Sequence, residues 1–337
     1  MTDQLADSYD TVVIGGGAAG LNGALMLARA RRSVLVIDAG EPRNAPADGV
    51  HGLLAREGMS PAELVERGRA EVRGYGGQII AGTVVAATRD SDSAAADGSS
   101  AAAVVETGVP GFTVELADGR TVRARRLLVT TGLVDELPDI AGLREQWGHN
   151  VIHCPYCHGW EVRDRAIGIM GSGPMSVHQA LLFRQWSPDI TYFAHHVPPT
   201  AEQAEQLAAR GIPVVTGDVA ALEITDGNIV GVRLADGTVV PRTAVAVATR
   251  MVARASFLAP LGLKAVDHPS GMGEHIPATD PTGRTEIPGV WVAGNVTDMS
   301  AQVGASAAAG AMAGAMINAD LVTEETATAV AAYRARA

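Results

Sequence analysis

The sequence has little positive charge, few aromatic side chains and almost no cysteine. Its 26 basic residues are outnumbered by 37 acidic ones, which argues against a general nucleic-acid binder and against binding to an anionic membrane surface. The first ten residues lack the basic and apolar regions of a signal peptide. No apolar run free of charge reaches the length that spans a bilayer. We therefore expect a cytoplasmic protein.

Aromatic residues make up 4% of the chain, whereas glycine and alanine are abundant. Small and aliphatic side chains suit closely packed layers of helices on sheets, which favours an α/β fold. The length of 337 residues predicts roughly two domains, at about 150 residues for each domain.

Cysteine occurs only at Cys154 and Cys157, within the stretch from His153 to Glu161. A Cys-x-x-Cys pair can close a small disulfide and exchange it with another thiol, and neighbouring histidines can lower the thiol pKa. His153 and His158 flank the pair directly. In a chain expected to be cytoplasmic, such a pair is more often catalytic than structural. The sequence therefore predicts a redox centre.

Other interpretations of this stretch stay open. The cysteines and their flanking histidines can supply half of the ligands of a zinc site. Structural zinc, however, normally takes two well-separated ligand pairs. The cysteines can also be inert residues of the core. For His158 the plain alternative to a catalytic role is packing or capping, and His149 and His153 have weaker claims to a role.

A glycine-rich turn, Gly15–Gly20, directly follows the β-branched run Thr11–Ile14. A helical apolar pattern and a second apolar run, Ser33–Ile37, come next, and Asp38 follows that run. Strand, glycine turn, helix, strand and acid are the context that the dinucleotide-binding fingerprint requires. The sequence therefore predicts a dinucleotide site at this turn.

Each residue of the fingerprint has a physical role. Gly15 permits the tight turn, and Gly17 lets the backbone approach a pyrophosphate. Gly20 lets the helix pack closely on the strand. The helix N-terminus offers free N–H groups to the phosphates, while Asp38 can accept hydrogen bonds from a ribose.

The segment after this unit gives weaker signals. Residues 41–58 predict a long loop over the bound dinucleotide. Arg43 and Asn44 follow the ribose-binding strand closely and are candidate cofactor ligands, whereas His51 has no assigned role. Ser60 and the residues after it predict a capped helix over Pro61–Val72.

Between that helix and the cysteines we expect mainly strands. Gln78–Ala87 and Gly111–Leu116 predict a small antiparallel sheet, and residues 90–103 are a low-complexity segment expected to be a mobile loop. Thr121–Val129 predicts a further strand. Leu133–Leu143 is expected to be an interdomain linker.

A second strand, glycine turn and helix follow the cysteines at residues 166–176. Ser176 stands where the third glycine of the fingerprint is expected, and His195 and His196 follow the next strand instead of an acid or arginines. We interpret this unit as one that keeps the fold but binds a nicotinamide dinucleotide poorly. Two hairpins around Asp226–Gly227 and Asp236–Gly237 come next.

Near the C-terminus, Gly289–Asp298 predicts a strand and a polar turn, followed by a helix over about 301–321 that is rich in small residues. Small residues allow close packing against neighbouring helices. The N-terminus of this helix would place a partial positive charge where it can stabilise an anion such as a reduced flavin.

In this order, the segments resemble the low-molecular-weight thioredoxin reductase family along nearly the whole chain. The resemblance rests on the Gly15–Gly20 turn, the Thr130–Gly132 strand end, the Cys-x-x-Cys before the second turn and the Ala293–Asp298 segment. It implies two Rossmann-like, doubly wound, three-layer domains in an α/β fold, and it implies a homodimer. FAD would bind residues 1–135 and 251–337, and residues 144–248 would form an inserted NADPH-domain-like unit.

The resemblance also assigns the remaining cofactor ligands. Besides the fingerprint residues, it implies that FAD contacts Thr131 and Gly132 at the strand end. It further implies contacts from Gly294, Asn295 and Gln302 near the C-terminus. No metal is expected.

Departures from the reductase pattern indicate a subfamily. His158 replaces the aspartate that follows the second cysteine, the basic cluster for an NADPH phosphate is missing, and Asn295 replaces an aspartate. The run from Cys154 to Trp160 is similar to dithiol oxidases that close the disulfide of gliotoxin, holomycin and related natural products. That similarity implies oxygen as electron acceptor.

The hypothesis is that a small dithiol attacks Cys154, that Cys157 leaves and reduces FAD, and that oxygen yields hydrogen peroxide. His158 would be the base, since an imidazole with a pKa near 6.5 suits thiol deprotonation at neutral pH. The alternative is an NAD(P)H-dependent thioredoxin or disulfide reductase. A non-catalytic flavoprotein that senses redox state is a further alternative.

Overall fold

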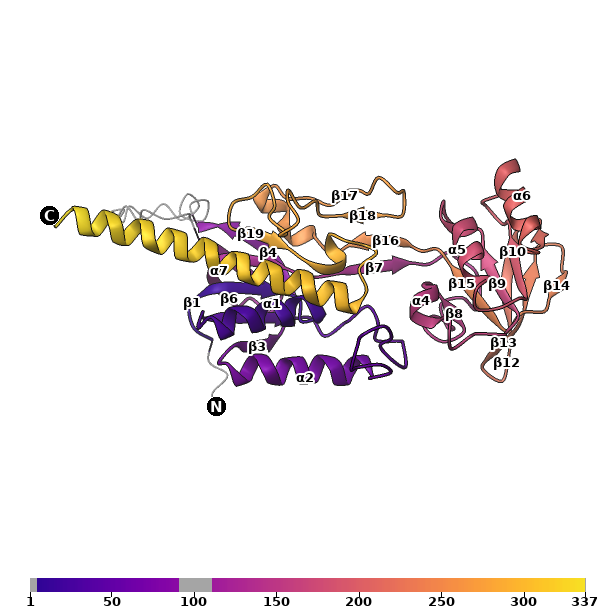
Figure 1. The fold of residues 1–337 in the computed structure, drawn as a ribbon, viewed down its shortest axis with the longest axis horizontal. Helices are drawn as coiled ribbons and strands as arrows, with labels where there is room; N and C mark the ends of the chain where they lie inside the picture. The colour runs from indigo at the N-terminus through magenta and orange to yellow at the C-terminus, as the bar shows by residue number, and fades with distance from the viewer. Residues whose placement is uncertain (1–4, 91–110, 337) are drawn as a thin grey trace.

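The computed structural model describes residues 5–90 and 111–336. The predicted mobile loop at 90–103 lies, apart from Asp90, outside the described residues. Two units stand at opposite ends of an elongated molecule, and two extended segments run between them (Figure 1). Helix α7 lies along the first unit and continues beyond it to the C-terminus (Figure 1).

The first unit is built on a seven-stranded sheet in the order β3-β2-β1-β6-β5-β4, in which β19 also pairs with β6. The pairs among β1, β2, β3, β6 and β19 are parallel, whereas β4 and β5 add antiparallel neighbours. The strands are β1 Ser8–Ile14, β2 Val34–Asp38, β3 Gln78–Ala81, β4 Val84–Arg89, β5 Phe112–Leu116, β6 Thr121–Val129 and β19 Val290–Val292.

One prediction about this sheet is wrong. Gln78–Ala87 is not a single strand of a separate antiparallel sheet, because the chain breaks at Gly82 and Thr83 into β3 and β4. β3 joins the parallel edge beside β2, and β4 pairs with β5 at the opposite edge. The apolar pattern of a strand does not reveal which neighbour it will pair with, so the sequence alone places both edges in one small sheet.

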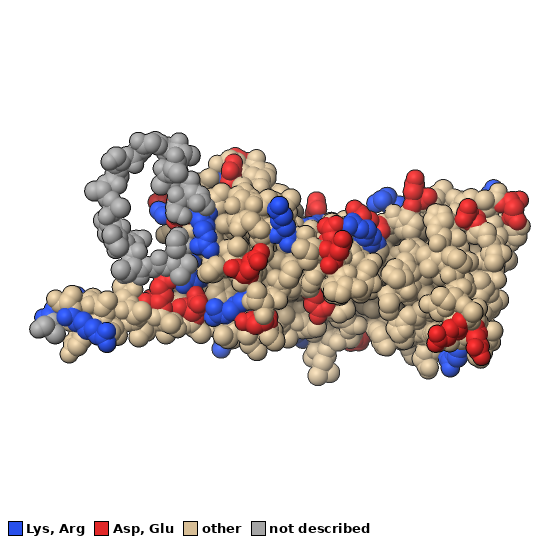
Figure 2. Space-filling model, turned by 90° about the horizontal axis from the view of Figure 1, so that it is seen from above, with Lys and Arg blue, Asp and Glu red and all other residues tan. Residues whose placement is uncertain are grey.

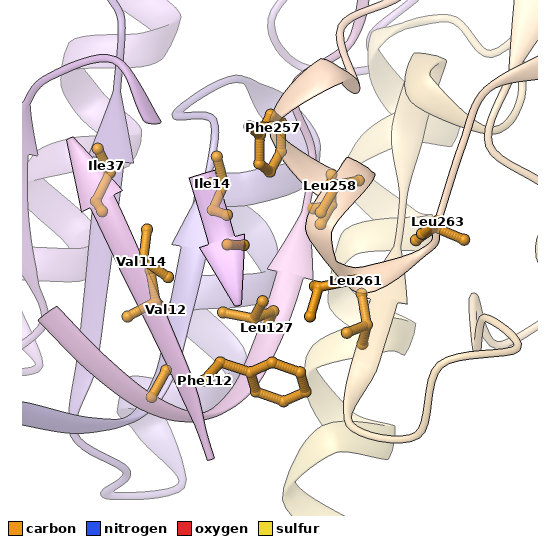
Figure 3. Packing of buried hydrophobic residues seen from close by; sticks show 14 of the residues in the cluster. Val12, Ile14, Ile37, Phe112, Val114, Leu127, Phe257, Leu258, Leu261 and Leu263 are labelled. Carbon is orange, nitrogen blue, oxygen red and sulfur yellow. The ribbon is translucent and has the colours of Figure 1, made fainter. Parts of the chain in front are cut away.

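The core lies on both faces of this sheet. On one face, Val12, Ile14 and Leu127 pack against Phe257 and other residues of the 3₁₀ helix η1, Ser256–Leu261 (Figure 3). The other face carries α1, Ala18–Arg29, and α7, Val303–Arg334, with α2, Pro61–Gly74, beside α1. Helix α2 begins where the capping pattern predicts, since Ser60 Oγ accepts from Glu63 N at 3.1 Å.

Small residues set the distance between α1 and α7, as the composition of α7 predicts. A Cβ on Gly310 would lie 1.9 Å from Ala19 O, and one on Gly314 would lie 2.6 Å from Gly23 O. Among the described residues, α7 is the one helix long and apolar enough to cross a bilayer by length and composition. Its packing on α1 gives that composition an explanation within the fold.

Ion pairs hold the polar side of α7 to the sheet and extend it past its predicted end at Leu321. The guanidinium of Arg126 is almost fully buried and donates to Asp320 at 2.7 Å and to Glu324 at 2.6 Å. Arg125 donates to Glu324 and Glu325. Acidic and basic side chains are interspersed over the face in Figure 2.

The second unit contains a parallel five-stranded sheet in the order β11-β10-β9-β15-β8. A three-stranded meander uses both predicted hairpin turns. The elements are β8 Val151–Ile152, α4 Pro155–His158, β9 Ile167–Met170, α5 Ser176–Phe183, β10 Ile190–Phe193, α6 Ala201–Ala209, β11 Val214–Val215, β12 Val219–Thr225, β13 Asn228–Leu234, β14 Val239–Val240 and β15 Ala244–Val247.

The two units are joined by β7, Leu133–Glu136, and β16, Arg250–Ala253, which pair antiparallel. The predicted linker is therefore partly a paired strand. The chain leaves the first unit through β7 and returns through β16, then forms β17 Val266–Asp267, β18 Glu274–His275, β19, the 3₁₀ helix η2 Gly294–Val296 and α7. The predicted α/β class with two Rossmann-like units is confirmed.

Candidate active site

The first glycine turn is open toward a cavity. Helix α1 begins directly after Gly17, and no described side chain caps it, so its first N–H groups remain available to an anion. A Cβ on Gly17 would meet no described atom within 4 Å, whereas one on Gly20 would lie 1.9 Å from Gly15 O. Gly17 therefore keeps space for a ligand, and Gly20 permits the contact between helix and turn.

Asp38 closes one side of this turn. It ends β2, and its Oδ2 accepts from Arg69 Nη2 of α2 at 2.6 Å. A Cβ on Gly16 would lie 2.6 Å from the Asp38 carboxylate, so the acid stands directly beside the glycine turn. This position suits an acceptor for ribose hydroxyls next to a bound pyrophosphate.

A cavity of about 1110 Å³ runs from this turn to the cysteine pair and has walls from both units. The structure brings together every predicted site residue except Gly20, whose role is packing. The predicted residues that line the cavity are Gly15, Gly17, Asp38, Arg43, Asn44, Thr131, Gly132, Gly294, Asn295, Gln302, Cys154, Cys157 and His158.

Two of these side chains have structural partners that the sequence did not indicate. Thr131 Oγ1 donates to Arg254 O at 2.7 Å. Asn295 Nδ2 donates to Ala301 O at 2.9 Å, which braces the turn before α7 and leaves the amide oxygen as the group to meet a ligand. Both residues therefore shape the cavity wall.

Arg43 is held by the connection between the units. Its guanidinium donates to both carboxylate oxygens of Asp135 in β7, at 2.6 and 2.8 Å. Asp135 also accepts from Thr249 Oγ1 at 2.6 Å, just before β16. Arg43 and Thr249 therefore fix Asp135 from two sides, and the Arg43–Asp135 ion pair stands at the cavity wall, where Arg43 lowers the pKa of both cysteine thiols. Arg43 lies in a loop, Asp135 in a predicted linker, and no sequence signal joins them.

The cysteine pair lies at the start of the short helix α4, with Cys154 as its N-cap. Both thiols are free in the structure. A hydrogen bond from Cys157, together with backbone N–H groups of Tyr156 and Cys157, lowers the pKa of Cys154 to about 7. The Cys154 thiolate in turn raises the pKa of Cys157. In the reduced pair Cys154 is therefore the more acidic thiol.

The two histidines that flank the cysteine pair differ in their hydrogen bonding. His153 Nδ1 lies 3.1 Å from Val247 O, and Gln179 Nε2 donates to His153 O at 2.6 Å, so His153 is anchored to the second unit. His158, in contrast, has two buried ring nitrogens with no hydrogen-bond partner in the described part of the chain. Burial is the main cause that lowers the pKa of His158, with contributions from His51 and His153. His158 is therefore a neutral imidazole with a free lone pair.

His51 is a cavity residue for which the sequence suggested no role. Its Nδ1 lies 2.6 Å from Glu57 Oε1, and its Nε2 lies 3.6 Å from Glu161 Oε1, just after the cysteine helix. His51 therefore connects the loop of the first unit to the second unit. A lone histidine in a loop carries no signal of such a contact.

The second glycine turn differs from the first. The N–H groups of Ser172 and Gly173 both donate to Ser176 Oγ at 3.1 Å. After β10, the rings of His195 and His196 stack at 3.7 Å, and Asp218 lies 3.9 Å from His196. The backbone N–H groups of this turn therefore already have a hydrogen-bond acceptor within the chain.

The zinc interpretation of the cysteines gains no support. Within 5–90 and 111–336, the one group of three side chains that can gather around an ion is His195, His196 and Asp218, away from the cysteines. His195 Nδ1 already accepts from Val219 N at 3.0 Å, which occupies the lone pair of that neutral ring.

Comparisons with known proteins agree with this arrangement. The crystal structure of HlmI matches with a TM-score of 0.89 and 45% identity over 99% of both chains. An oxidoreductase from Agrobacterium tumefaciens matches with a TM-score of 0.82 and 34% identity, over 94% of this chain and 99% of that one. Thioredoxin reductase tcpT of Claviceps purpurea is 28% identical over 85% of this chain and 86% of its own length.

The predicted resemblance to thioredoxin reductase-like disulfide enzymes is confirmed by these relatives. The family model for pyridine nucleotide-disulphide oxidoreductases matches residues 9–315. Proteins of this kind are typically flavin-dependent, and the open turn at Gly17 beside Asp38 fits a dinucleotide such as FAD. The chain belongs to the pyridine nucleotide-disulphide oxidoreductase family, as a thioredoxin reductase-like oxidoreductase that acts on sulfur.

Proposed function

We propose that this protein is an FAD-dependent dithiol oxidase that forms an intramolecular disulfide in a small-molecule dithiol of the natural-product type. The observation that carries the proposal is His158, a buried imidazole without a hydrogen-bond partner in the described chain, beside the cysteine pair in the cavity. An unprotonated imidazole can take the proton of an incoming thiol. Oxygen is the proposed acceptor of the electrons, and hydrogen peroxide the second product.

The cofactor site follows from the residues of the first unit. The N–H groups at the start of α1 would hold the pyrophosphate, and Asp38 the ribose. The Asn295 amide oxygen and Gln302 stand at the other end, beside the N-terminus of α7. Bound there, FAD would supply a two-electron acceptor beside the cysteines that oxygen can reoxidise.

The cysteines exchange disulfides in two steps. A substrate thiol gives its proton to His158, and the thiolate attacks Cys154 Sγ of the oxidised pair; the Cys154–Cys157 bond breaks, and Cys157 leaves as a thiolate. The second substrate thiolate then attacks the substrate sulfur of the mixed disulfide, and Cys154 leaves. The pair would close its disulfide again by giving two electrons to bound FAD, from which oxygen would take them. The two electrons and two protons lost by the substrate balance the reduction of one oxygen molecule to hydrogen peroxide.

The thiol pKa values suit this order. A leaving thiol departs faster when its pKa is low, and the backbone N–H groups of Tyr156 and Cys157, which lower the pKa of Cys154, stay in place during the second step. The pKa of Cys157 is raised mainly by its hydrogen bond with Cys154, a cause that is lost once Cys154 is in the mixed disulfide. The positive charge of Arg43 lowers the pKa of both thiols.

Oxygen uptake with a panel of small dithiols tests the proposal. We expect multiple turnovers without a nicotinamide, one peroxide for each disulfide formed, and slow turnover of monothiols. The alternative, an NAD(P)H-dependent disulfide reductase, is favoured by the names of relatives such as tcpT. It predicts rapid anaerobic bleaching of the flavin by NADPH, and that result would refute the oxidase. A redox sensor would show no multiple turnover with any dithiol in air. The cytoplasmic location and the homodimer stay predictions.

A further inference from the structure

We infer that Ser176 closes the phosphate-binding turn of the second unit, so that this unit cannot accept the pyrophosphate of a nicotinamide dinucleotide. What the closed turn means for catalysis rests on the proposed function, because an oxidase that draws electrons from its dithiol needs no second dinucleotide. Ser176 would then determine the electron donor without touching the substrate, the cofactor or the cysteines.

The hydroxyl of Ser176 occupies the position of an anion. In a functional glycine turn, successive backbone N–H groups point at the phosphate oxygens. Here the N–H groups of Ser172 and Gly173 each donate to Ser176 Oγ at 3.1 Å. Ser176 is fully buried, so water does not compete for these bonds. Ser172 N also donates to Met170 O at 2.9 Å, whereas Gly173 N has Ser176 Oγ as its acceptor. The chain thereby satisfies its own donors where a ligand would otherwise do so.

The helix that follows offers fewer donors than the equivalent helix of the first unit. Helix α1 begins directly after the second glycine of its turn, Gly17, whereas α5 begins two residues later, at Ser176. Pro174 stands at the position that corresponds to the first residue of α1, and proline has no backbone N–H to give. The N-terminus of α5 therefore stands back from the turn.

The ribose side of the second unit lacks an acid. In the first unit Ile14 pairs with Ile37, and Asp38 is the next residue. In the second unit Met170 pairs with Phe193, so the corresponding residue is Ala194. Ala194 is buried and has no acceptor in its side chain. A dinucleotide would therefore lose its ribose contact as well as its phosphate contacts.

Binding of ADP-ribose, which contains the pyrophosphate and the adenosine ribose, tests the inference. The flavin-saturated holoenzyme is titrated calorimetrically, and the flavin absorbance is followed to verify that the first site stays filled. We expect no saturable binding to the native protein. Ser176→Ala should bind at least about fivefold more tightly than the limit set by the native protein, the order of magnitude of the one neutral hydrogen bond, from Gly173 N, that no longer needs to be displaced.

A matched control comes from the same unit. Ser187 is buried and its Oγ accepts from Asp189 N at 3.1 Å, so Ser187→Ala removes an equivalent hydroxyl elsewhere. This variant should bind no ADP-ribose. Adding Ala194→Asp to Ser176→Ala should increase the affinity further by restoring the ribose acceptor. If Ser176→Ala fails to fold, Ser176→Gly takes its place.

Two results would overturn the inference: saturable binding of ADP-ribose to the native second unit, or a folded Ser176 variant that gains no affinity. Neither depends on dithiol turnover. If the native protein instead fails to oxidise any dithiol while Ser176→Ala gains ADP-ribose binding, the proposed function fails and the closed turn stands.

Discussion

The first and second glycine turns of this chain have the same βαβ setting and opposite exposure to a ligand. At the first turn, a Cβ on Gly17 would meet no described atom, and α1 begins at once without a side-chain cap at the cavity wall. At the second, Ser176 fills the corresponding donors with its own hydroxyl. The first unit keeps its turn open to the cavity, as the proposed binding of FAD requires. The other keeps the framework and presents the cysteine pair.

The difference arises at the third position of the glycine pattern. At Gly20 any side chain is excluded, since a Cβ would lie 1.9 Å from Gly15 O. At Ser176 the delayed start of α5 leaves room for a side chain, which then reaches back to the turn. The third position of the pattern and the later start of α5 together separate a turn with open donors from one that supplies its own acceptor.

The largest expected effect is loss of the cofactor from the first turn. Gly17→Val should fold, because no described atom lies within 4 Å of the new Cβ and the backbone φ of −81° is ordinary. Its side chain would occupy the space of the pyrophosphate, and the protein should purify almost colourless. Flavin content for each folded chain, from absorbance and circular dichroism, is the measurement.

Gly74→Val is the matched control for this change, since a Cβ there also meets no described atom and Gly74 does not line the cavity. Gly173→Ala, at the equivalent position of the second turn, should also keep its flavin. A yellow Gly17→Val protein would show that the first turn does not hold the cofactor.

The next largest effect concerns the cysteine pair, which the second unit carries. Cys154→Ser and Cys157→Ser should each abolish turnover, with different spectra. Cys154→Ser removes the thiolate that raises the pKa of Cys157, so the remaining Cys157 thiolate should give a charge-transfer band with the flavin. Cys157→Ser should lack the band and trap mixed disulfides, visible by mass spectrometry. The reverse pair of spectra would reverse the proposed order of attack.

His158→Ala should reduce the rate of flavin reduction by the dithiol about 10²-fold at neutral pH, the usual lower range for loss of a general base. The lowered pKa of His158 keeps the imidazole neutral at neutral pH, and its base form is lost only as the pH falls through that lowered pKa. The variant should instead lose rate as the pH falls below the thiol pKa of the substrate, near 8.5.

Anaerobic stopped-flow traces between acid and alkaline pH measure this difference. Reoxidation by oxygen serves as the internal control, because it needs no thiol deprotonation. His149→Ala, an exposed histidine that does not line the cavity, is the control variant. Unchanged flavin reduction with slowed reoxidation would move His158 to the oxygen side of the cycle.

Features that depend on local order could be predicted from the sequence, whereas pairings of distant positions could not. Gly17, Asp38 and Cys154 were predicted because their roles depend on local order: a turn between strand and helix, an acid after a strand, a pair two residues apart. The paired connection of β7 with β16 and the ion pair of Arg43 with Asp135 join positions far apart in the chain. Local pattern contains no information about such pairing.

Ser176 is the instructive intermediate case. The sequence shows a serine where the third glycine of the fingerprint is expected, and it gives no reason to expect more than a side chain that the packing tolerates. Only the three-dimensional turn shows that its hydroxyl meets two N–H groups. The length of α7 is likewise not predictable from local sequence. The ion pairs from Arg126 that support its outer half come from a strand almost 200 residues earlier.

The smallest effect tests the acid that distinguishes the two ribose positions. Asp38→Asn keeps the size of the side chain and an oxygen for Arg69, but it replaces a charged acceptor of the ribose hydroxyls with a neutral one. Hydrogen bonds to charged groups contribute about 1.5–3 kcal/mol, and neutral ones roughly half as much. FAD affinity, measured by flavin fluorescence on reconstitution of the apoprotein, should therefore fall about tenfold with the flavin spectrum unchanged. Glu66→Gln is the matched control, because Glu66 also lies near Arg69, at 3.5 Å, and is far more exposed. If both variants weaken FAD binding equally, Asp38 acts through the charge balance around Arg69, and the contrast with Ala194 says nothing about ribose recognition.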